Sequence, residues 1–450
     1  MMRTGKPVAS AAGHGHGSVA NHAWDSMSQE AVAMAGTAPQ ERMPRLSPLD
    51  MLVFLRSSSN VEYYRRKARP MLYRKCGNDP EYVHDFVLYL LHRYGRIYSA
   101  ISRHTASKPP KNLEVKINGV DVIPFGTAAG MDKDLEALHA FGSIFGFQEP
   151  GTIVVRPRPG NPRVRVATID DSMDMVNAQG FPSKGLDYAL KNIREYRRSG
   201  GKGIIYASIC GLPGEGRDGI DVAMSEVDTL ASALEQHVDG FVWNPYSPNT
   251  AALARLRDPD VFRNTAKAIR KRAPGKLLLV KMGPYEPEER GNAFALVSGF
   301  IEGGGNGVVT TNTKMLPKGQ LPERVRNVWG YASAGRSGRF LGGYRMRSVK
   351  EIRRRFPDAV IAATGGICTA DDAFKSFCAG ANLVEGFTPY AYLGTGLVKE
   401  LMKGVSEMLV KRGTDLESLQ RHVSQLAAEN NDKELDRVLE DGKASGGAMA

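Results

Sequence analysis

A short apolar run followed by a longer segment recurs eight times from residue 118 onward. The runs are rich in β-branched residues, as buried parallel strands are, and most of the longer segments are long enough for a helix. The expected strands are 122–127, 152–155, 203–209, 240–243, 277–282, 307–311, 360–364 and 383–387. Because parallel strands are usually joined by a crossover helix, this alternation predicts an α/β protein with a parallel sheet.

The first expected strand distinguishes a closed barrel from an open, doubly wound sheet. An open dinucleotide-binding sheet carries a GxGxxG turn after this strand, but residues 128–133 read Ala-Ala-Gly-Met-Asp-Lys. Eight βα units therefore predict a (β/α)8 TIM barrel, which we place at residues 112–412. Active sites of such barrels lie at the carboxyl ends of the strands, so the polar residues that follow each run are the candidates for chemistry.

The segment before the barrel divides into two parts. Residues 1–55 are expected to be a disordered leader or an organelle transit segment, because they are rich in Gly, Ala, Ser and His and have no acidic residue before Asp25. Few arginines occur there, which leaves both alternatives open. His14 and His16 have no companion ligands, so no metal site is expected.

Residues 56–105 predict a cap of two amphipathic helices. The second helix repeats apolar residues at steps of three and four, which gives one apolar face. These residues are Val83, Phe86, Val87, Leu90, Leu91 and Tyr94. The face could pack on the barrel, or, together with a nearby basic cluster, the cap could rest on anionic lipid. The basic cluster consists of Arg56, Arg65, Arg66, Lys67, Arg69, Arg74 and Lys75. Residues 413–450 predict a helical or disordered tail without chemistry.

Charge and cysteine content restrict the partners only in part. The chain has 60 Lys and Arg against 48 Asp and Glu, a net charge of +12, which suits an anionic substrate, a phosphate-bearing cofactor or an acidic membrane surface. No aromatic residues interleave a basic stripe, so nucleic acid is a poor candidate. The four cysteines form no CxxC pair, which argues against structural zinc or a disulfide framework. No apolar run near the front is long enough to span a bilayer.

Asparagines follow three of the expected strand regions. Residues 244–250 read Asn-Pro-Tyr-Ser-Pro-Asn-Thr, Asn312 follows the sixth strand, and Asn177 follows the second strand region. Amides can hydrogen-bond a planar heterocycle through donors and acceptors, and a hydroxyl among them could move a proton. Each stretch alone could be an ordinary turn, but their convergence on one barrel mouth favours a binding site.

Lysines and glycines at other strand ends suggest an anionic ligand. Lys133 follows the first strand, and Lys281 lies within the apolar fifth strand, where its buried charge needs an anionic partner such as a reduced flavin. Gly338, Gly365 and Gly366 suit a phosphate held by backbone N–H groups. A lysine at a strand end is also common on a surface, and a glycine pair is a weak signal alone.

These motifs together resemble the dihydroorotate dehydrogenases of the quinone-using class, over residues 60–412. The matching stretches are 128–133, 151–163, 177–181, 247–250, 311–313, 337–338 and 364–367, in the family's order and spacing. Residues 68–73 and 79–84 are similar to the helical cap that forms the quinone tunnel and touches the membrane in this class. The other class uses Cys as base, so Ser247 places this chain in the quinone class.

The resemblance implies a role for each matching residue. Ser247 would be the catalytic base. The substrate would be held by Lys133, Asn177, Phe181, Asn244, Asn249, Asn312 and Thr313. The prosthetic group FMN would be held by Ala129, Gly130, Thr152, Ser208, Asn244, Lys281, Thr311, Gly338, Gly366, Phe387 and Thr388. No metal is implied.

The chain also departs from the family's pattern. Ser208 replaces an Asn after the third strand, Thr168 stands where an arginine usually faces quinone, and Tyr-Thr-Gly reads Phe387-Thr388-Pro389. A proline removes a backbone N–H donor, here near the expected phosphate or quinone. The usual Asn-Arg-x-Gly-Phe-Asn reads Asn-Ala-Gln-Gly-Phe-Pro at 177–182. These departures affect the expected electron acceptor and the expected affinity for FMN more than the expected pyrimidine site.

The resemblance thus implies oxidation of (S)-dihydroorotate to orotate in pyrimidine synthesis, with electrons passed to a quinone at a membrane. That membrane would be the mitochondrial inner membrane in a eukaryote or the cell inner membrane in a bacterium. One alternative is a related FMN barrel with another substrate or acceptor. Another is a non-catalytic, degenerate barrel at the membrane.

Overall fold

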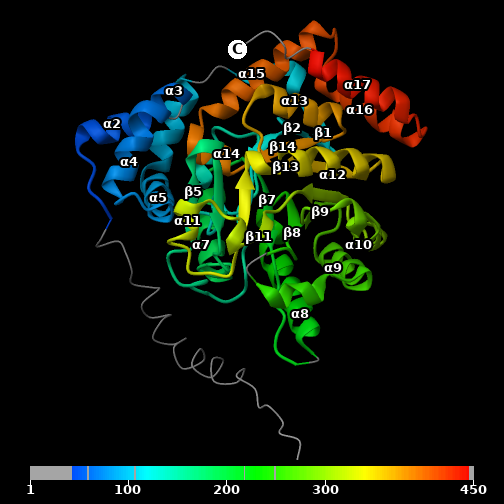
Figure 1. The fold of residues 1–450 in the computed structure, drawn as a ribbon, viewed down its shortest axis with the longest axis horizontal. Coiled ribbons are helices and arrows are strands. Elements are labelled where there is room, and N and C mark those ends of the chain that lie inside the picture. The colour runs from blue at the N-terminus through cyan, green and yellow to red at the C-terminus, as the bar shows by residue number, and fades with distance from the viewer. Residues whose placement is uncertain (1–42, 58–59, 106–107, 217, 248–249, 445–450) are drawn as a thin grey trace, which may run out of the picture. The chain divides into compact units, whose positions relative to one another are not determined.

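The computed structural model describes residues 43–57, 60–105, 108–216, 218–247 and 250–444. Most of the expected leader, and Asn249, lie outside the described residues. Residues 44–450 form one compact unit, drawn from blue to red in Figure 1.

A closed barrel of eight parallel strands forms the centre of this unit, which confirms the predicted fold class. Its strands are β3 (Phe125–Thr127), β4 (Phe147–Gln148), β7 (Ile204–Ile209), β8 (Gly240–Trp243), β9 (Leu277–Met282), β10 (Gly307–Thr310), β13 (Val360–Thr364) and β14 (Leu383–Gly386). The last strand, β14, pairs with β3 and closes the ring. Seven of the eight expected strands contain a barrel strand.

The second expected strand, 152–155, is wrong. The barrel strand there is β4, which pairs with β3 and β7, and of residues 152–155 only Ile153 forms a bridge, to Ile209. Gly151 has φ 119° and turns the chain between β4 and Ile153. The β-branched composition of 152–155 is strand-like, but the turn separates most of it from the sheet.

Helices surround the barrel and bury their apolar faces on it. They are α6 (Leu138–Phe141), α7 (Leu186–Arg198), α8 (Gly219–Leu234), α9 (Pro259–Arg272), α10 (Arg290–Glu302), α12 (Gly342–Arg355), α13 (Ala370–Cys378), α14 (Thr388–Leu393) and α15 (Leu397–Lys411). The outward-facing Trp243 of β8 packs on Phe262 of α9 and Phe300 of α10, with ring centroids 4.8 and 6.2 Å away. The segment 133–145 after β3 is long enough for a longer helix but contains only α6, because the Asp132 side chain accepts hydrogen bonds from the N–H groups of Glu136 and Ala137 and holds a loop.

A four-stranded antiparallel sheet, which the sequence did not predict, brings further residues to the carboxyl ends of the strands. Its order is β11 (Lys314–Pro317), β12 (Ser333–Gly338), β6 (Asp174–Asn177) and β5 (Val166–Ile169). It packs on a small apolar cluster around Trp329, near the short helix α11 (Glu323–Arg326). Asn177 ends β6 and Gly338 ends β12, so this sheet carries two of the expected site residues.

The cap begins earlier than expected. Helix α2 (Pro48–Arg56) starts inside the segment 1–55 that we expected to be a leader, because Ser47 and Asp50 form a capping box and Pro48 opens the first turn. The chain continues through α3 (Val61–Tyr63), a π-helical turn (Tyr64–Ala68) and α4 (Arg69–Lys75) to α5 (Pro80–Thr105).

The apolar face of α5 packs on the barrel unit, as one alternative predicted. Phe86 is fully buried, and Leu90 and Leu91 are each 3% exposed. Gly95 comes close to α6, since a Cβ at this position would lie 3.4 Å from that of His139. The blue cap helices therefore lie against the side of the barrel near α14 and β5 (Figure 1).

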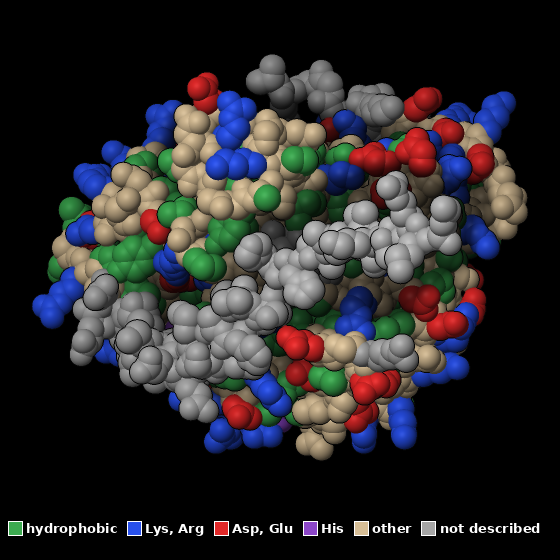
Figure 2. All heavy atoms as spheres, turned by 60° about the horizontal axis from the view of Figure 1, so that its bottom comes forward, with side chains coloured by type: hydrophobic (Ala, Val, Ile, Leu, Met, Phe, Trp, Pro, Cys, Tyr) green, Lys and Arg blue, Asp and Glu red, His purple; other side chains and the backbone are tan. Residues whose placement is uncertain are grey.

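The remaining elements lie at the edges. The hairpin β1 (Val115–Ile117) and β2 (Val120–Val122) precedes the barrel, while α16 (Leu416–Ala428) and α17 (Asp432–Ala444) pack on α13. Within the described residues, no helix is long and apolar enough to cross a membrane. On the face shown in Figure 2, Lys and Arg side chains are interspersed with Asp and Glu.

Candidate active site

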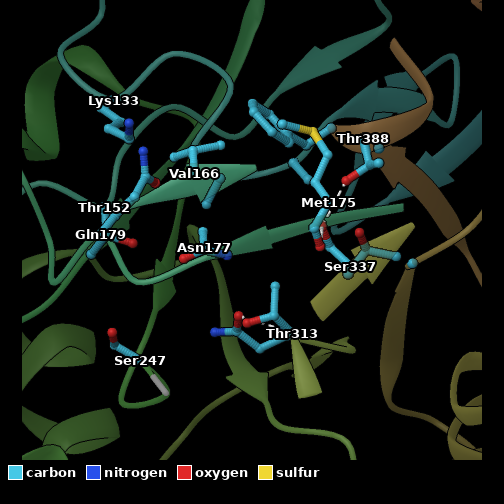
Figure 3. Close-up of a pocket in the computed structure, with 18 of the residues that line it drawn as sticks. Lys133, Thr152, Val166, Met175, Asn177, Gln179, Ser247, Thr313, Ser337 and Thr388 are labelled. Atoms are coloured by element: carbon cyan, nitrogen blue, oxygen red, sulfur yellow. Dashed lines mark hydrogen bonds between the residues drawn. The ribbon is translucent and has the colours of Figure 1, made fainter. Parts of the chain in front are cut away.

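One large cavity opens at the carboxyl ends of the barrel strands, with a volume of about 1260 Å³ including its mouth. Its walls come from strand ends, from the antiparallel sheet and from the start of α5. The expected site residues that line it are Ala129, Gly130, Lys133, Thr152, Asn177, Phe181, Asn244, Ser247, Lys281, Thr311, Asn312, Thr313, Gly338, Gly366, Phe387 and Thr388. Figure 3 shows several of them around the space.

Two expected residues are not found on the wall. Ser208 is fully buried, and its Oγ lies 3.0 Å from Oγ1 of Thr152, which does line the cavity. Its place in the structure is thus behind the wall, supporting Thr152. Asn249 lies outside the described residues.

Amide and hydroxyl groups at one end of the cavity hydrogen-bond to one another. Asn244 donates from Nδ2 to Oγ1 of Thr152 at 2.8 Å, and its Oδ1 accepts from Nδ2 of Asn312 at 3.3 Å. Asn312 also donates to the carbonyl of Tyr246. The three elements that end here are thereby fixed relative to one another, which preorganises a polar surface for a planar ligand. We call Thr152, Asn244 and Asn312 the amide cluster.

Ser247 borders the amide cluster and is 9% exposed. The hydroxyl of Thr250 donates to Oγ of Ser247 at 3.4 Å, and the N–H of Thr250 donates to the carbonyl of Ser247 at 3.3 Å. The local turn thus brings a second hydroxyl to the serine. A serine that acted as a base would need such a partner, or water, to pass on a proton.

Asn177 and Phe181 reach the cavity from β6 and the loop after it. Asn177 donates from Nδ2 to the carbonyl of Gly335 at 3.2 Å, which ties β6 to β12. Phe181 adopts φ 57°, a region that is costly for a bulky side chain. Such strained residues are concentrated at functional sites, where surrounding contacts hold them in place.

Lys133 is accessible only in part, through the cavity, and lies beside the cap. Burial lowers the pKa of Lys133 below its usual value, although the negative charges of Asp85 and Glu81 on α5 oppose this lowering. Glu81 in turn forms a buried ion pair with Arg165, at 2.8 Å. The cap therefore contributes charged groups to the wall of the cavity, beside the residues of the barrel.

Lys281 has protein partners that the sequence analysis did not identify. Its Nζ lies 3.2 Å from Oε1 of Glu149 and 3.5 Å from Oε1 of Glu385, and both carboxyl side chains are 1% exposed. Lys281 thus has anionic partners, as expected for a charge in an apolar strand. The same reasoning applies to Glu385, which is a charged residue in the expected strand 383–387. Burial alone would lower the pKa of Lys281, but the two carboxyls raise it.

The opposite end of the cavity is lined by glycines. A Cβ on Gly366, where φ is 70°, would lie 2.7 Å from the carbonyl oxygen of Gly338, so the wall has no room for a side chain there. The hydroxyl groups of Ser337 and Thr388 form a hydrogen bond of 2.8 Å (Figure 3). Oγ1 of Thr311 is buried without a hydrogen-bond partner among the described residues, and Thr311 lines the cavity. Closely approaching glycine backbones and an unsatisfied hydroxyl fit a polar, phosphate-bearing cofactor.

Aromatic and apolar groups close the side of the cavity toward the cap. Phe387 contacts His84 of α5 edge to face, with ring centroids 5.6 Å apart, and His84 bonds through Nε2 to the carbonyl of Met131 at 3.0 Å. Thr168 pairs with Met175 across the sheet and shares a strand face with Val166. Both Met175 and Val166 line the cavity, so Thr168 belongs to this side.

Comparison with known proteins is consistent with this geometry. The family model described as dihydroorotate dehydrogenase matches residues 112–409. The chain belongs to the dihydroorotate dehydrogenase family. It is 33% identical over 345 residues to a protein named dihydroorotate dehydrogenase (quinone) from Salinispora arenicola, covering 75% of this chain and 97% of that protein. A protein of the same name from Anaeromyxobacter dehalogenans is 31% identical over 350 residues, covering 74% of this chain and 91% of that protein.

A solved structure of a family member is also similar. The structure of the Eimeria tenella enzyme in complex with ferulenol has a TM-score of 0.67 and 25% sequence identity, and the match covers 79% of this chain and 99% of that chain. Nearly the whole of that chain is therefore matched by this one.

Proposed function

We propose that this protein is a dihydroorotate dehydrogenase (quinone) that oxidises (S)-dihydroorotate to orotate with bound FMN. The observation that carries the proposal is the single cavity in which Ser247 and the amide cluster lie at one end and the glycine wall at the other. Family membership and the names of the relatives support the same activity.

Ser247 is the proposed base for the C5 proton of dihydroorotate. It is the hydroxyl that borders the amide cluster, and Thr250 provides a hydrogen-bonded route for the proton to leave. The hydrogen at C6 leaves as a hydride. Orotate therefore forms with loss of one proton from C5 and of one hydride, which carries two electrons, from C6. Asn244 and Asn312 of the amide cluster, with Asn177 and Thr313, would orient the pyrimidine. Phe181 would pack on it, and Lys133 would pair with its carboxylate. Asn249 keeps its proposed substrate role from the resemblance alone.

FMN is the proposed prosthetic group, and it supplies the hydride acceptor when bound. Gly338, Gly366 and Thr388 would hold its phosphate, and the unsatisfied hydroxyl of Thr311 would gain a partner. Ala129, Gly130, Thr152 and Phe387 would contact the cofactor elsewhere along the wall, and Ser208 would act through Thr152. Lys281 offers the positive charge nearest to this space within the barrel strands.

A quinone is the proposed acceptor, and α2 to α5 the proposed route to a membrane. Leu49 and Leu52 of α2 are 69% and 60% exposed, and the same part of the chain, from α2 to α4, carries exposed cations. Those cations are Arg56, Arg65, Arg66, Lys67, Arg74 and Lys75. Apolar residues beside cations suit a surface that rests on anionic lipid. The membrane would be the mitochondrial inner membrane in a eukaryote or the cell inner membrane in a bacterium.

One experiment tests the main steps separately. Purified protein is mixed anaerobically with dihydroorotate while flavin absorbance is recorded, and a quinone is then added. We expect bleaching followed by recovery. Absence of flavin, or no bleaching with dihydroorotate, would reject the proposed activity.

Another acceptor is the second candidate, because Thr168 and Phe387 lack the guanidinium and hydroxyl expected to meet a quinone carbonyl. Recovery with fumarate or oxygen but not with quinone would favour it and leave the pyrimidine half of the proposal intact.

A further inference from the structure

Two carboxyl groups share one ammonium group in the floor of the cavity. Nζ of Lys281 lies 3.2 and 3.4 Å from the two carboxyl oxygens of Glu149 and 3.5 Å from Oε1 of Glu385. All three side chains are at least 94% buried, and only Lys281 lines the cavity. We call these residues the Lys281 triad.

The ionised Lys281 triad would have an unbalanced net charge. With every group ionised, the triad carries two negative charges and one positive charge in the protein interior, where an unpaired charge is costly. Within the described part of the chain, no ion pair links another cation to either carboxyl. The ammonium of Lys281, at 3.5 Å, is the ion-pair partner of Oε1 of Glu385, and the carboxyl of Glu149 is the other side chain that hydrogen-bonds to Glu385.

The elements packed around the triad do not supply the missing charge. Gly126 of β3 lies beside Glu385 in the sheet register, Val309 of β10 lies beside Lys281, and neither can ionise. Tyr390 of α14 is the other titratable neighbour of Glu385, and burial, followed by the charge of Glu385, raises its pKa, so it stays neutral. Burial, followed by the nearby charge of Glu149, raises the pKa of Glu385 well above its usual value, while Lys281 opposes the rise.

We propose that Glu149 and Glu385 together hold one proton, so that the Lys281 triad has no net charge, and that this proton is thermodynamically coupled to reduction of the cofactor. The pair acts through Lys281 and does not itself touch the cavity, so both glutamates are positioning residues. This inference rests on the proposed function, which supplies the bound flavin.

The coupling follows from charge balance. A hydride brings the cofactor two electrons and one proton, and therefore one added negative charge. If the carboxyl pair has lost its proton, that charge arrives beside a triad that is already anionic, and the reduced form is bound less tightly. By reciprocity, reduction favours uptake of a proton from water by the pair.

The test compares the dissociation constants of reduced and oxidised FMN as pH is raised, in the parent protein and in Glu385→Gln. In the parent, the ratio of the reduced to the oxidised constant should rise by up to about tenfold per pH unit while the pair loses its proton. Glu385→Gln leaves one carboxylate opposite one ammonium, so no second carboxyl loses a proton as pH is raised and this extra rise should vanish. Glu149→Gln should behave alike, and the surface variant Glu407→Gln should keep the parent's behaviour. Equal pH dependence in the parent and both buried variants would overturn the proposal.

A second measurement needs no substitution and no cofactor. Infrared spectra of parent protein labelled with carbon-13 at the glutamate carboxyl should contain a neutral carboxylic acid band that shifts with the label at neutral pH. Asp132, whose pKa burial raises to about 7, can contribute an unshifted band. Absence of any label-shifted band would overturn the shared proton. If that band is present but dihydroorotate fails to bleach the flavin, the proposed function fails and the shared proton stands.

Discussion

The two sides of the cavity differ in how they are built. The proposed pyrimidine side, with Ser247 and the amide cluster, comes mainly from the ends of barrel strands and is held by short-range hydrogen bonds. The proposed acceptor side, with Phe387 and Thr168, meets a cap helix and an antiparallel sheet and is mostly apolar. We expect chemistry on the first side to depend on individual polar atoms. We expect the shape of the second side to depend on how the cap is attached to the barrel. Substitutions should therefore affect the two half-reactions separately.

Ser247→Ala tests the pyrimidine side most directly. Loss of a positioned acid-base group should slow flavin reduction by dihydroorotate by about 10²- to 10⁴-fold, with orotate affinity nearly unchanged. Stopped-flow absorbance measures the rate, and a titration with orotate measures the affinity. Reduction at the parent rate would remove Ser247 as the base, and reoxidation by quinone should be normal in either case.

Glu81→Gln tests how the cap is attached. The variant leaves the buried guanidinium of Arg165 without its carboxylate partner, which should lower the free energy of unfolding by about 3–5 kcal/mol. The exposed pair of Glu62 and Arg66 provides a matched control, since Glu62→Gln should cost about 0.5 kcal/mol or less. Denaturant unfolding measures both. Equal small losses would show that the cap is held by its apolar face alone.

Residues at strand ends could be predicted from the sequence, whereas long-range ion pairs could not. Strand periodicity located seven barrel strands, and the residues after them followed from topology, because parallel strands bring their carboxyl ends to one mouth. The ion pair of Glu81 with Arg165 joins residues 84 positions apart, and no local pattern encodes it. The same holds for Glu149 and Lys281, 132 positions apart.

Local composition also misled in two places. Residues 152–155 have the composition of a strand, but the turn at Gly151 leaves only Ile153 bridged. The predicted leader is too long because the short helix α2 lies at its end, where the capping residues Ser47 and Asp50 are the local signal for a helix start. The type of an element was therefore predictable where a hydrophobic pattern repeats. The ends of helices and strands were not, because they depend on single turns and capping residues.

Thr168→Arg with Phe387→Tyr tests the acceptor side. Adding a charged and a neutral hydrogen-bond donor, worth about 1.5–3 and 0.5–1.5 kcal/mol, should lower the Michaelis constant for quinone by about one to three decades. Flavin reduction by dihydroorotate should not change, because it depends on the other side. Unchanged quinone kinetics would mean that the two positions do not meet the acceptor.

Lys133 lies where the two sides meet, and its pKa gives a pH test. Because burial lowers that pKa, the side chain loses its positive charge at a lower pH than an ordinary lysine. Orotate affinity should therefore fall by about ten- to 100-fold as pH rises through this value, the worth of a charged hydrogen bond. Lys133→Met should bind orotate weakly at every pH. A parent affinity that is independent of pH would remove Lys133 as the carboxylate partner.

Thr388→Val tests whether the glycine-lined end is a phosphate site, and it carries the smallest expected effect. The substitution keeps the shape of the side chain but removes the hydroxyl that meets Ser337 at 2.8 Å. Loss of one neutral hydrogen bond, about 0.5–1.5 kcal/mol, should weaken FMN binding by about two- to tenfold. Riboflavin, which has no phosphate, should bind parent and variant alike, and fluorescence titration of the apoprotein measures both ligands. If riboflavin loses as much affinity as FMN, Thr388 contacts the ring or the ribityl chain. The phosphate would then have to lie elsewhere, and the glycine wall around Gly366 would no longer explain the division of the cavity into two ends.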